Sequence, residues 1–327
     1  MSLALSVRTE RFPLAGTFTT SRDAKTEAVV VVAELSDGRH RGRGECVANP
    51  RYGLTPEQVA AAIEAMRGAL AGGLDRPGLQ SAMLAGPARN ALDCALWDLE
   101  AKRSGLPVHV LAGLPIPAAL VTAYTISLGA PDVMAKAAAA AASRPLLKIK
   151  LGAPGDPARI RAVRMAAPKA ELIVDANEGW NDGNLAENIA ACAAVGVIQI
   201  EQPLPAAHDD ALARTTRTVP ICADESVQDR SSLKQLIGKY DAVNIKLDKT
   251  GGLTEALAMA DAAQALGFEI MIGCMVATSL SMAPAMLVTP QARFVDLDGP
   301  LLLARDRDHA LRYDGSMVYP PDASLWG

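Results

Sequence analysis

The second half of the chain repeats one unit. Short apolar segments begin about every 22 to 27 residues, and alanine-rich segments with helical spacing follow them. The expected strands are 120–128, 146–151, 171–175, 197–201, 220–224, 242–247, 269–273 and 293–296. The expected helices are 131–143, 157–167, 184–195, 231–239 and 254–266. Since strands that alternate with helices pair in parallel, eight units predict a (β/α)8-type barrel. A doubly wound open sheet is the alternative, although its glycine-rich nucleotide fingerprint is missing from the sequence.

The first 110 residues follow a different pattern. Residues 3–14, 27–35 and 39–46 alternate like antiparallel strands, with a hairpin turn at Asp37-Gly38. Residues 55–70 and 88–103 are expected to be helices. This arrangement predicts a separate α+β domain.

Composition narrows the classes of partner. The 327 residues carry 32 basic and 36 acidic side chains, a net charge of −4, with no basic run. Neither nucleic acid nor an anionic membrane is therefore expected as a partner. The five cysteines are far apart and are expected to be reduced, and the first residues do not resemble a signal peptide. These features favour a cytoplasmic protein.

One uncharged stretch, 270–292, is long enough to cross a bilayer. It contains Gly273, Pro284 and several hydroxyl residues. We therefore expect a buried strand, a turn and a helix there.

Carboxylates stand where the expected strands end, which is where a parallel barrel places its chemistry. Asp175, Glu201 and Asp224 end three successive strands. Because neighbouring strands are about 4.8 Å apart, the three groups can converge. Their repulsion would be relieved by a divalent cation, and all-oxygen ligands favour Mg²⁺, with Mn²⁺ also compatible. The alternative is that each acid caps a helix or pairs with an arginine.

Lysines flank these carboxylates. Lys148 and Lys150 end the preceding strand and Lys246 ends the following one. A lysine in an apolar strand, beside another cation, has its charged form disfavoured, which suits it to act as a base. We expect Lys150 and Lys246 to be bases and Lys249 to lie in a loop. The alternative is that the lysines are exposed or paired for structural reasons.

Two bases on opposite faces of a metal-held carboxylate indicate a 1,1-proton transfer. One lysine would remove the α-proton, the metal ion would stabilise the enediolate, and the other lysine would return a proton to the opposite face. The expected reaction is racemisation or epimerisation.

These residues resemble the motifs of the enolase superfamily, muconate-lactonizing subgroup. The matching segments are Lys148-Ile-Lys150, Asp175-Ala-Asn177, Glu201-Gln-Pro203, Asp224-Glu225-Ser226, Asn244-Ile-Lys246 with Gly251-Gly252, and 89–99. The resemblance covers nearly the whole chain. It implies an α/β fold: a modified TIM barrel of (β/α)7β form with an N-terminal α+β capping domain whose loops close on the substrate. The implied bounds are 1–115 for the cap, 116–300 for the barrel and 301–327 for a segment that returns to the cap.

The resemblance also implies roles for individual residues. The metal ligands and the two acid/base residues would be those proposed above: Asp175, Glu201, Asp224, Lys150 and Lys246. Lys148 would contact the substrate carboxylate and lower the pKa of Lys150. Glu225 would orient Lys246, and Asn177 would support the metal ligands.

A further motif narrows the substrate. Asp296-Leu-Asp298 resembles the Asp-x-Asp motif of dipeptide epimerases, in which two carboxylates would bind the substrate's free α-ammonium. The alternative is a salt bridge with a nearby arginine. The wider sequence resembles epimerases of the L-Ala-D/L-Glu type, which act in murein-peptide recycling.

The expected substrate is therefore an L-Ala-Glu-type dipeptide. Its acidic side chain needs a cation, and the capping loops offer Arg22, Lys25 and Arg51, while Tyr52 and Cys274 are expected to line the same pocket. Other Ala-x or hydrophobic dipeptides remain open as substrates. So do N-acylamino acid racemisation, muconate-type cycloisomerisation and a non-catalytic barrel. Whether the chain forms a homo-oligomer also stays open.

Overall fold

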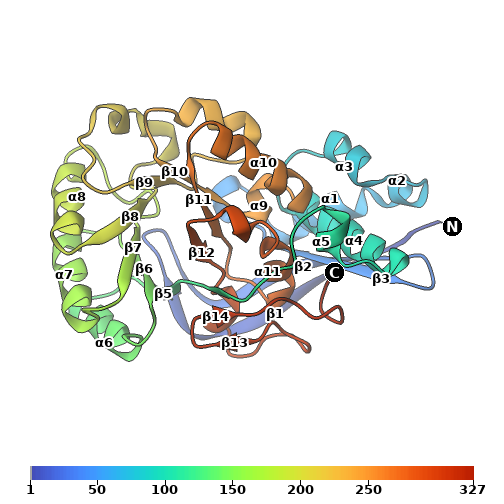
Figure 1. Ribbon diagram of the computed structural model, residues 1–327, viewed down its shortest axis with the longest axis horizontal. Helices are drawn as coiled ribbons and strands as arrows, with labels where there is room; N and C mark the ends of the chain where they lie inside the picture. Colours follow the sequence, from blue (N-terminus) through green and yellow to red (C-terminus); the bar gives the residue numbers. More distant parts are fainter. Residues whose placement is uncertain (1) are drawn as a thin grey trace.

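The computed structural model describes residues 2–327 and shows two kinds of architecture in one chain (Figure 1). The N-terminal part contains an antiparallel sheet in the order β1-β2-β3, formed by β1 (Ala4–Thr19), β2 (Ala24–Ser36) and β3 (Arg41–Cys46). The expected hairpin turn joins β2 to β3, and Gly38 has a φ of +90° that favours glycine.

Helices cover one face of this sheet. Their bounds are α1 (Pro56–Glu64), α2 (Arg67–Ala71), α3 (Arg76–Ala82), α4 (Pro87–Ser104) and α5 (Val108–Leu111). The single helix expected at 55–70 is wrong: it breaks into α1 and α2 at Met66, where the chain turns and Leu70 is still buried. The long helix α4 lies against β3 at Gly44, where a Cβ atom would come within 2.1 Å of the Ala91 carbonyl oxygen.

The second part is an eight-stranded parallel barrel. Its strands follow chain order: β5 (Tyr124–Ile126), β6 (Leu146–Lys150), β7 (Glu171–Asp175), β8 (Val197–Glu201), β9 (Ile221–Ala223), β10 (Ala242–Ile245), β11 (Glu269–Gly273) and β12 (Phe294–Asp296). The Ala123 N–H donates to the Val295 carbonyl at 2.8 Å, which links the first strand to the last. The barrel prediction is confirmed, and the open-sheet alternative is wrong.

Helices surround the strands (Figure 1). They are α6 (Pro131–Ala140), α7 (Asp156–Ala166), α8 (Leu185–Ala194), α9 (Leu247–Thr250), α10 (Leu253–Ala265) and α11 (Ser279–Ala285). The α-helix expected at 231–239 is wrong, because Arg230–Leu236 is a 3₁₀ segment. The Ser232 hydroxyl donates to the Asp229 carbonyl there, and such local bonds compete with regular helix formation. The stretch 270–292 forms β11, a turn and α11, and no helix within residues 2–327 is long and apolar enough to span a membrane.

The C-terminal residues contact both parts. β13 (Tyr313–Asp314) pairs with β14 (Met317–Val318), which in turn pairs with β4 (Leu120–Val121) below the barrel. Trp326 Nε1 then donates to the Cys94 carbonyl of α4 at 3.0 Å. The segment thus ties the barrel to the N-terminal helices.

Candidate active site

A row of charged side chains lies along the carboxyl ends of five neighbouring strands. Its members, in sheet order from β6 to β10, are Lys150, Asp175, Glu201, Asp224 and Lys246. Lys150 is in register with Asp175, and Asp175 with Glu201. Each of the five is at most 7% exposed. The fold thus brings together all five of the residues expected to form the metal and proton-transfer site.

Each carboxylate of the row faces a lysine. Lys150 Nζ lies 2.6 Å from Asp175 Oδ2, and Lys246 Nζ lies 2.6 Å from Asp224 Oδ2. Lys148 Nζ lies 2.7 Å from Glu201 Oε2. Within residues 2–327 no three His, Cys, Asp or Glu side chains form a ready metal cluster. The carboxylates are satisfied by ammonium groups instead.

This pairing sets the protonation of the site. Burial disfavours the charge of Lys246, but the fields of Asp224 and Glu201 outweigh it and raise the pKa of Lys246. The pKa of Lys148 is raised in the same way by Asp296 and Glu201. The lowered pKa expected for Lys246 as a base is therefore not found, because carboxylates lie closest to its ammonium group. Burial and the neighbouring Asp175 raise the pKa of Glu201 to about 7.

Lys249 belongs to this site, and its expected place in a loop is wrong. It lies in α9 and is 3% exposed. Its Nζ atom donates to the carbonyl oxygen and to Oδ1 of Asp224, at 2.6 Å each. Residues three apart share one side of a helical turn, so its spacing from Lys246 was the available signal.

Two amides that the sequence did not single out hold the carboxylates in place. Gln202 Oε1 accepts the backbone N–H groups of Asp224 and Ser226, at 2.9 and 3.1 Å. Asn244 Nδ2 donates to Glu201 Oε1 at 2.8 Å. Both amides are fully buried, and Gln202 has a φ of +35°. The sequence could have indicated both amides, because Gln202 directly follows Glu201 and Asn244 stands two residues before Lys246.

Asn177 supports the row through its backbone. Its N–H donates to Asp175 Oδ1 at 2.9 Å, whereas its own side-chain Oδ1 is buried without a hydrogen-bond donor. Its φ of +44° is unusual for a residue other than glycine. The turn after β7 is thus shaped around the Asp175 carboxylate.

Asp296 and Asp298 lie at the end of β12 beside the row. Asp296 Oδ2 accepts from Lys148 at 2.7 Å, while Asp296 Oδ1 is buried without a donor. Asp298 Oδ2 accepts the Thr125 N–H at 2.6 Å, and burial together with Asp296 raises the pKa of Asp298 to about 7. Within residues 2–327 neither carboxylate pairs with an arginine, so the salt bridge considered as an alternative is not formed.

Loops of the N-terminal part reach the same end of the barrel. Arg22, in the turn between β1 and β2, contacts Glu225 Oε1 at 2.6 Å and Glu178 Oε2 at 3.2 Å. Arg51, in the 3₁₀ segment Pro50–Tyr52, donates from Nε and Nη2 to both oxygens of Glu178. Lys25 instead pairs with Asp23 and its side chain is 43% exposed. The structure therefore places the two arginines at the mouth of the barrel.

Other expected pocket residues are near the row. Tyr52 ends the 3₁₀ segment Pro50–Tyr52, and burial and the charge of Asp224 raise the pKa of its hydroxyl. Cys274 follows β11, and its thiol pKa is raised by burial and by Asp296 and Asp298. Phe18, which the sequence did not indicate, has its ring centre 5.7 Å from Lys150 Nζ.

Glu225 differs from its expected role. Its Oε1 atom pairs with Arg22, and within residues 2–327 no hydrogen bond joins it to Lys246. The lysine is held by Asp224 instead.

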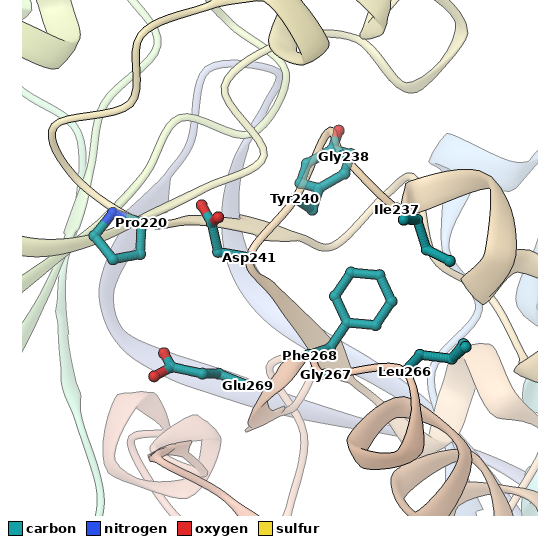
Figure 2. A pocket seen from close by; sticks show the side chains of 9 residues that line it. All are labelled: Pro220, Ile237, Gly238, Tyr240, Asp241, Leu266, Gly267, Phe268 and Glu269. Carbon is teal, nitrogen blue, oxygen red and sulfur yellow. The ribbon is translucent and has the colours of Figure 1, made fainter.

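A hollow at the other end of the barrel is unrelated to this site (Figure 2). Pro220, Asp241 and Glu269 line it, and they stand at the amino ends of β9, β10 and β11. It lies away from the charged row.

Two family models match the chain. Residues 2–113 match the mandelate racemase/muconate lactonizing enzyme N-terminal domain, and residues 132–324 match the enolase C-terminal domain-like family. An L-Ala-D/L-Glu epimerase from Escherichia coli is 48% identical over 93% of this chain and 95% of the relative. An N-acetyl-D-glutamate racemase from Pseudoalteromonas is 44% identical over 91% of this chain and 95% of the relative.

Solved structures similar to this chain are also related to dipeptide epimerases. An enolase family member from Agrobacterium tumefaciens with homology to dipeptide epimerases, solved with sodium and L-Ala-L-Glu, has a TM-score of 0.98 and 56% identity over 99% of this chain and 100% of its own. A dipeptide epimerase from Enterococcus faecalis, solved with Mg and L-Leu-L-Tyr, has a TM-score of 0.92 and 27% identity over 100% and 99%. The chain therefore belongs to the mandelate racemase/muconate lactonizing enzyme family of the enolase superfamily and is a racemase/epimerase homologous to L-Ala-D/L-Glu epimerases.

Proposed function

We propose that the chain is a Mg²⁺-dependent dipeptide epimerase that inverts the C-terminal residue of L-Ala-Glu-type dipeptides by 1,1-proton transfer, and that it serves murein-peptide recycling. The observation that carries the proposal is the order along the barrel mouth. Lys150 and Lys246 stand at the two ends of a row whose middle is three buried carboxylates. A substrate carboxylate drawn to the middle of the row would have one lysine on either side of its α-carbon.

Asp175, Glu201 and Asp224 are the residues that would hold the metal ion. Their donors are all carboxylate oxygens, which Mg²⁺ prefers. Glu201 Oε2 is buried and already lies 2.7 Å from the Lys148 ammonium group, although it accepts no aligned hydrogen bond, so this oxygen faces a cation in the present structure. When bound, the ion would take up carboxylate charge that now raises the pKa of Lys246, and it would stabilise the negative charge that develops on the substrate.

The two lysines would move the proton. One removes the α-proton from its face of the substrate, and the other, protonated beforehand, donates to the opposite face. A positioned general base or acid of this kind contributes roughly 10²- to 10⁴-fold to the rate. Lys148 is 2% exposed and contacts Glu201 and Asp296, and its ammonium group would bind the substrate carboxylate beside the metal ion.

Two further parts of the site would recognise a dipeptide: the Asp296–Asp298 pair and Arg22. The substrate's α-ammonium would bind Asp296 and Asp298, since Asp296 Oδ1 is a buried acceptor without a donor. An acidic side chain would bind Arg22, whose side chain is 34% exposed at the barrel mouth. The likeness to an L-Ala-D/L-Glu epimerase supports this substrate class.

A racemase of N-acylated amino acids is the second candidate, because an N-acetyl-D-glutamate racemase is nearly as similar to the chain. Its substrate has the same side-chain carboxylate but no α-ammonium. The two candidates therefore differ at Asp298: Asp298→Asn should impair dipeptide turnover far more than turnover of N-acetylglutamate.

The proposal is tested by proton exchange in D₂O. The protein with Mg²⁺ is incubated with a library of L-Ala-x dipeptides and with N-acetylglutamate, and α-deuterium is followed by mass spectrometry. We expect deuterium and the second epimer to appear with L-Ala-L-Glu. Absence of α-deuterium in every dipeptide would refute the proposal, and exchange confined to N-acetylglutamate would favour the second candidate.

A metal titration accompanies this experiment. Mg²⁺ should raise the melting temperature, because a ligand present at 100 times its Kd stabilises the folded state by about 2.7 kcal/mol. Asp175→Asn, Glu201→Gln and Asp224→Asn should each weaken this response, whereas Asp298→Asn should retain it.

A further inference from the structure

Arg22 uses only part of its guanidinium. Its Nη1 atom donates to Glu225 Oε1 at 2.6 Å, to the Asn177 carbonyl at 3.0 Å and to Glu178 Oε2 at 3.2 Å. Among the contacts of residues 2–327, the Nε and Nη2 atoms of Arg22 donate to no side chain. The fork that matches a carboxylate is thus left for another ligand, while the charge of the group already has a buried partner in Glu225, whose side chain is 3% exposed.

Arg51 is engaged differently. It holds both oxygens of Glu178, and Glu178 Oε1 also accepts the Ala206 N–H at 2.8 Å. A bidentate pair is stronger and more directional than a single contact. Of the two arginines at the mouth, Arg22 is therefore the one that can serve a substrate.

The four charged side chains balance before a substrate binds. Arg22 and Arg51 carry two positive charges, and Glu178 and Glu225 carry two negative ones. A neutral substrate side chain leaves this balance unchanged. An acidic side chain adds a negative charge and must share Arg22 with Glu225.

We infer that Glu225 is an internal counter-ion that sets the substrate range: it keeps Arg22 paired when the substrate side chain is neutral and competes with the side chain when it is acidic. The inference rests on the proposed function and deepens it. A partly buried guanidinium that met a neutral side chain without Glu225 would be left under-compensated, which is costly. With Glu225 present, the preference for an acidic over a neutral side chain is reduced, so both classes bind.

The test compares two substrates of equal shape. The ratio of kcat/KM for L-Ala-L-Glu to that for L-Ala-L-Gln is measured for the full chain with Mg²⁺, in the wild type and in Glu225→Gln. Gln keeps the size of the side chain and an oxygen for Arg22 but removes the charge. We expect the ratio to rise about tenfold, since removal of the competitor favours the acidic substrate and penalises the neutral one. Because Glu225 follows Asp224, overall activity can fall as well, but a loss common to both substrates cancels in the ratio.

Matched variants isolate the effect. Glu225→Asp keeps the charge and should leave the ratio near the wild-type value. Glu225→Ala removes the same charge with a different side-chain volume and should shift the ratio as Glu225→Gln does, so a folding defect in one variant leaves the other as the test. Asp182→Asn removes an exposed carboxylate from the loop after β7 and should leave the ratio unchanged.

Arg22 must mediate the effect. In an Arg22→Gln background, Glu225→Gln should no longer raise the ratio. An unchanged or lower ratio in both Glu225→Gln and Glu225→Ala, with wild-type epimerisation intact, would overturn this inference alone. If the wild type epimerises neither dipeptide, the proposed function is wrong and this inference falls with it.

Discussion

Lys148 joins β6 to β12 through its ion pair with Asp296, at 2.7 Å. The two strands are separated by β5, so the lysine reaches across an intervening strand at the carboxyl end of the barrel. Its ammonium group also contacts Glu201 at 2.7 Å and Asp175 at 3.3 Å. One buried cation therefore compensates three carboxylates that would otherwise repel one another.

Lys148→Met should destabilise the protein when divalent cations are removed by a chelator. Breaking a buried pair leaves uncompensated charge, and we expect the free energy of unfolding to fall by about 3–5 kcal/mol. Urea denaturation with and without Mg²⁺ measures this. Lys136→Met, at an exposed position of α6, is the matched control and should change stability by less than about 0.5 kcal/mol. Equal stabilities of the two variants would contradict the structural role of Lys148.

Lys150→Ala and Lys246→Ala should each lose epimerisation by roughly 10²-fold or more, because every inversion needs a base on one face and an acid on the other. Each variant should still exchange the α-proton of one epimer with D₂O, since the remaining lysine works from its own side. Measuring exchange with L-Ala-L-Glu and L-Ala-D-Glu separately assigns a face to each lysine. Inversion at the wild-type rate in either variant would show that the base assignment is wrong.

Dipeptide turnover should depend on the ionisation of Asp298. The pKa of Asp298 is raised to about 7, first by burial and then by Asp296, so the carboxyl is neutral below that pH and charged above it. A neutral carboxyl binds an ammonium group weakly. We therefore expect kcat/KM for L-Ala-L-Glu to fall as the pH drops below about 7, and the Asp298→Asn variant to lose that limb of the profile. A profile of the variant that keeps the same limb would assign the titration to another group.

Glu178 should hold the capping loops on the barrel. Its side chain is 8% exposed and pairs with Arg22 and Arg51, each of which is 34% exposed. Glu178→Gln weakens partly exposed ion pairs, so we expect a local loss of about 1 kcal/mol and roughly fivefold faster trypsin cleavage after Arg22 and Arg51. Mass spectrometry of the fragments identifies the sites. The control variant Glu187→Gln, at an exposed position of α8, should be cleaved by trypsin at the wild-type rate.

Much of the barrel could be predicted because its pattern is local. The expected strands 171–175, 197–201 and 269–273 coincide with β7, β8 and β11, since each is a short apolar run bounded by polar or turn residues. The break between α1 and α2 and the 3₁₀ segment Arg230–Leu236 could not be predicted. They depend on which side chains the rest of the fold buries and on local hydroxyl bonds.

The sequence by itself determined the number and order of the strands and the residue types at their ends. Strands that are consecutive in the sequence lie side by side in a parallel barrel. The sequence alone therefore predicted that five strand-end residues would lie close together: Asp175, Glu201, Asp224, Lys150 and Lys246. Only the tertiary structure decided how these charges pair. In the structure Lys249 pairs with Asp224, Glu225 pairs with Arg22, and Lys25 pairs with Asp23 instead of entering the site. Such pairings join residues up to 203 positions apart, and which of them forms depends on burial and on the approach of the capping loops, which no local pattern encodes.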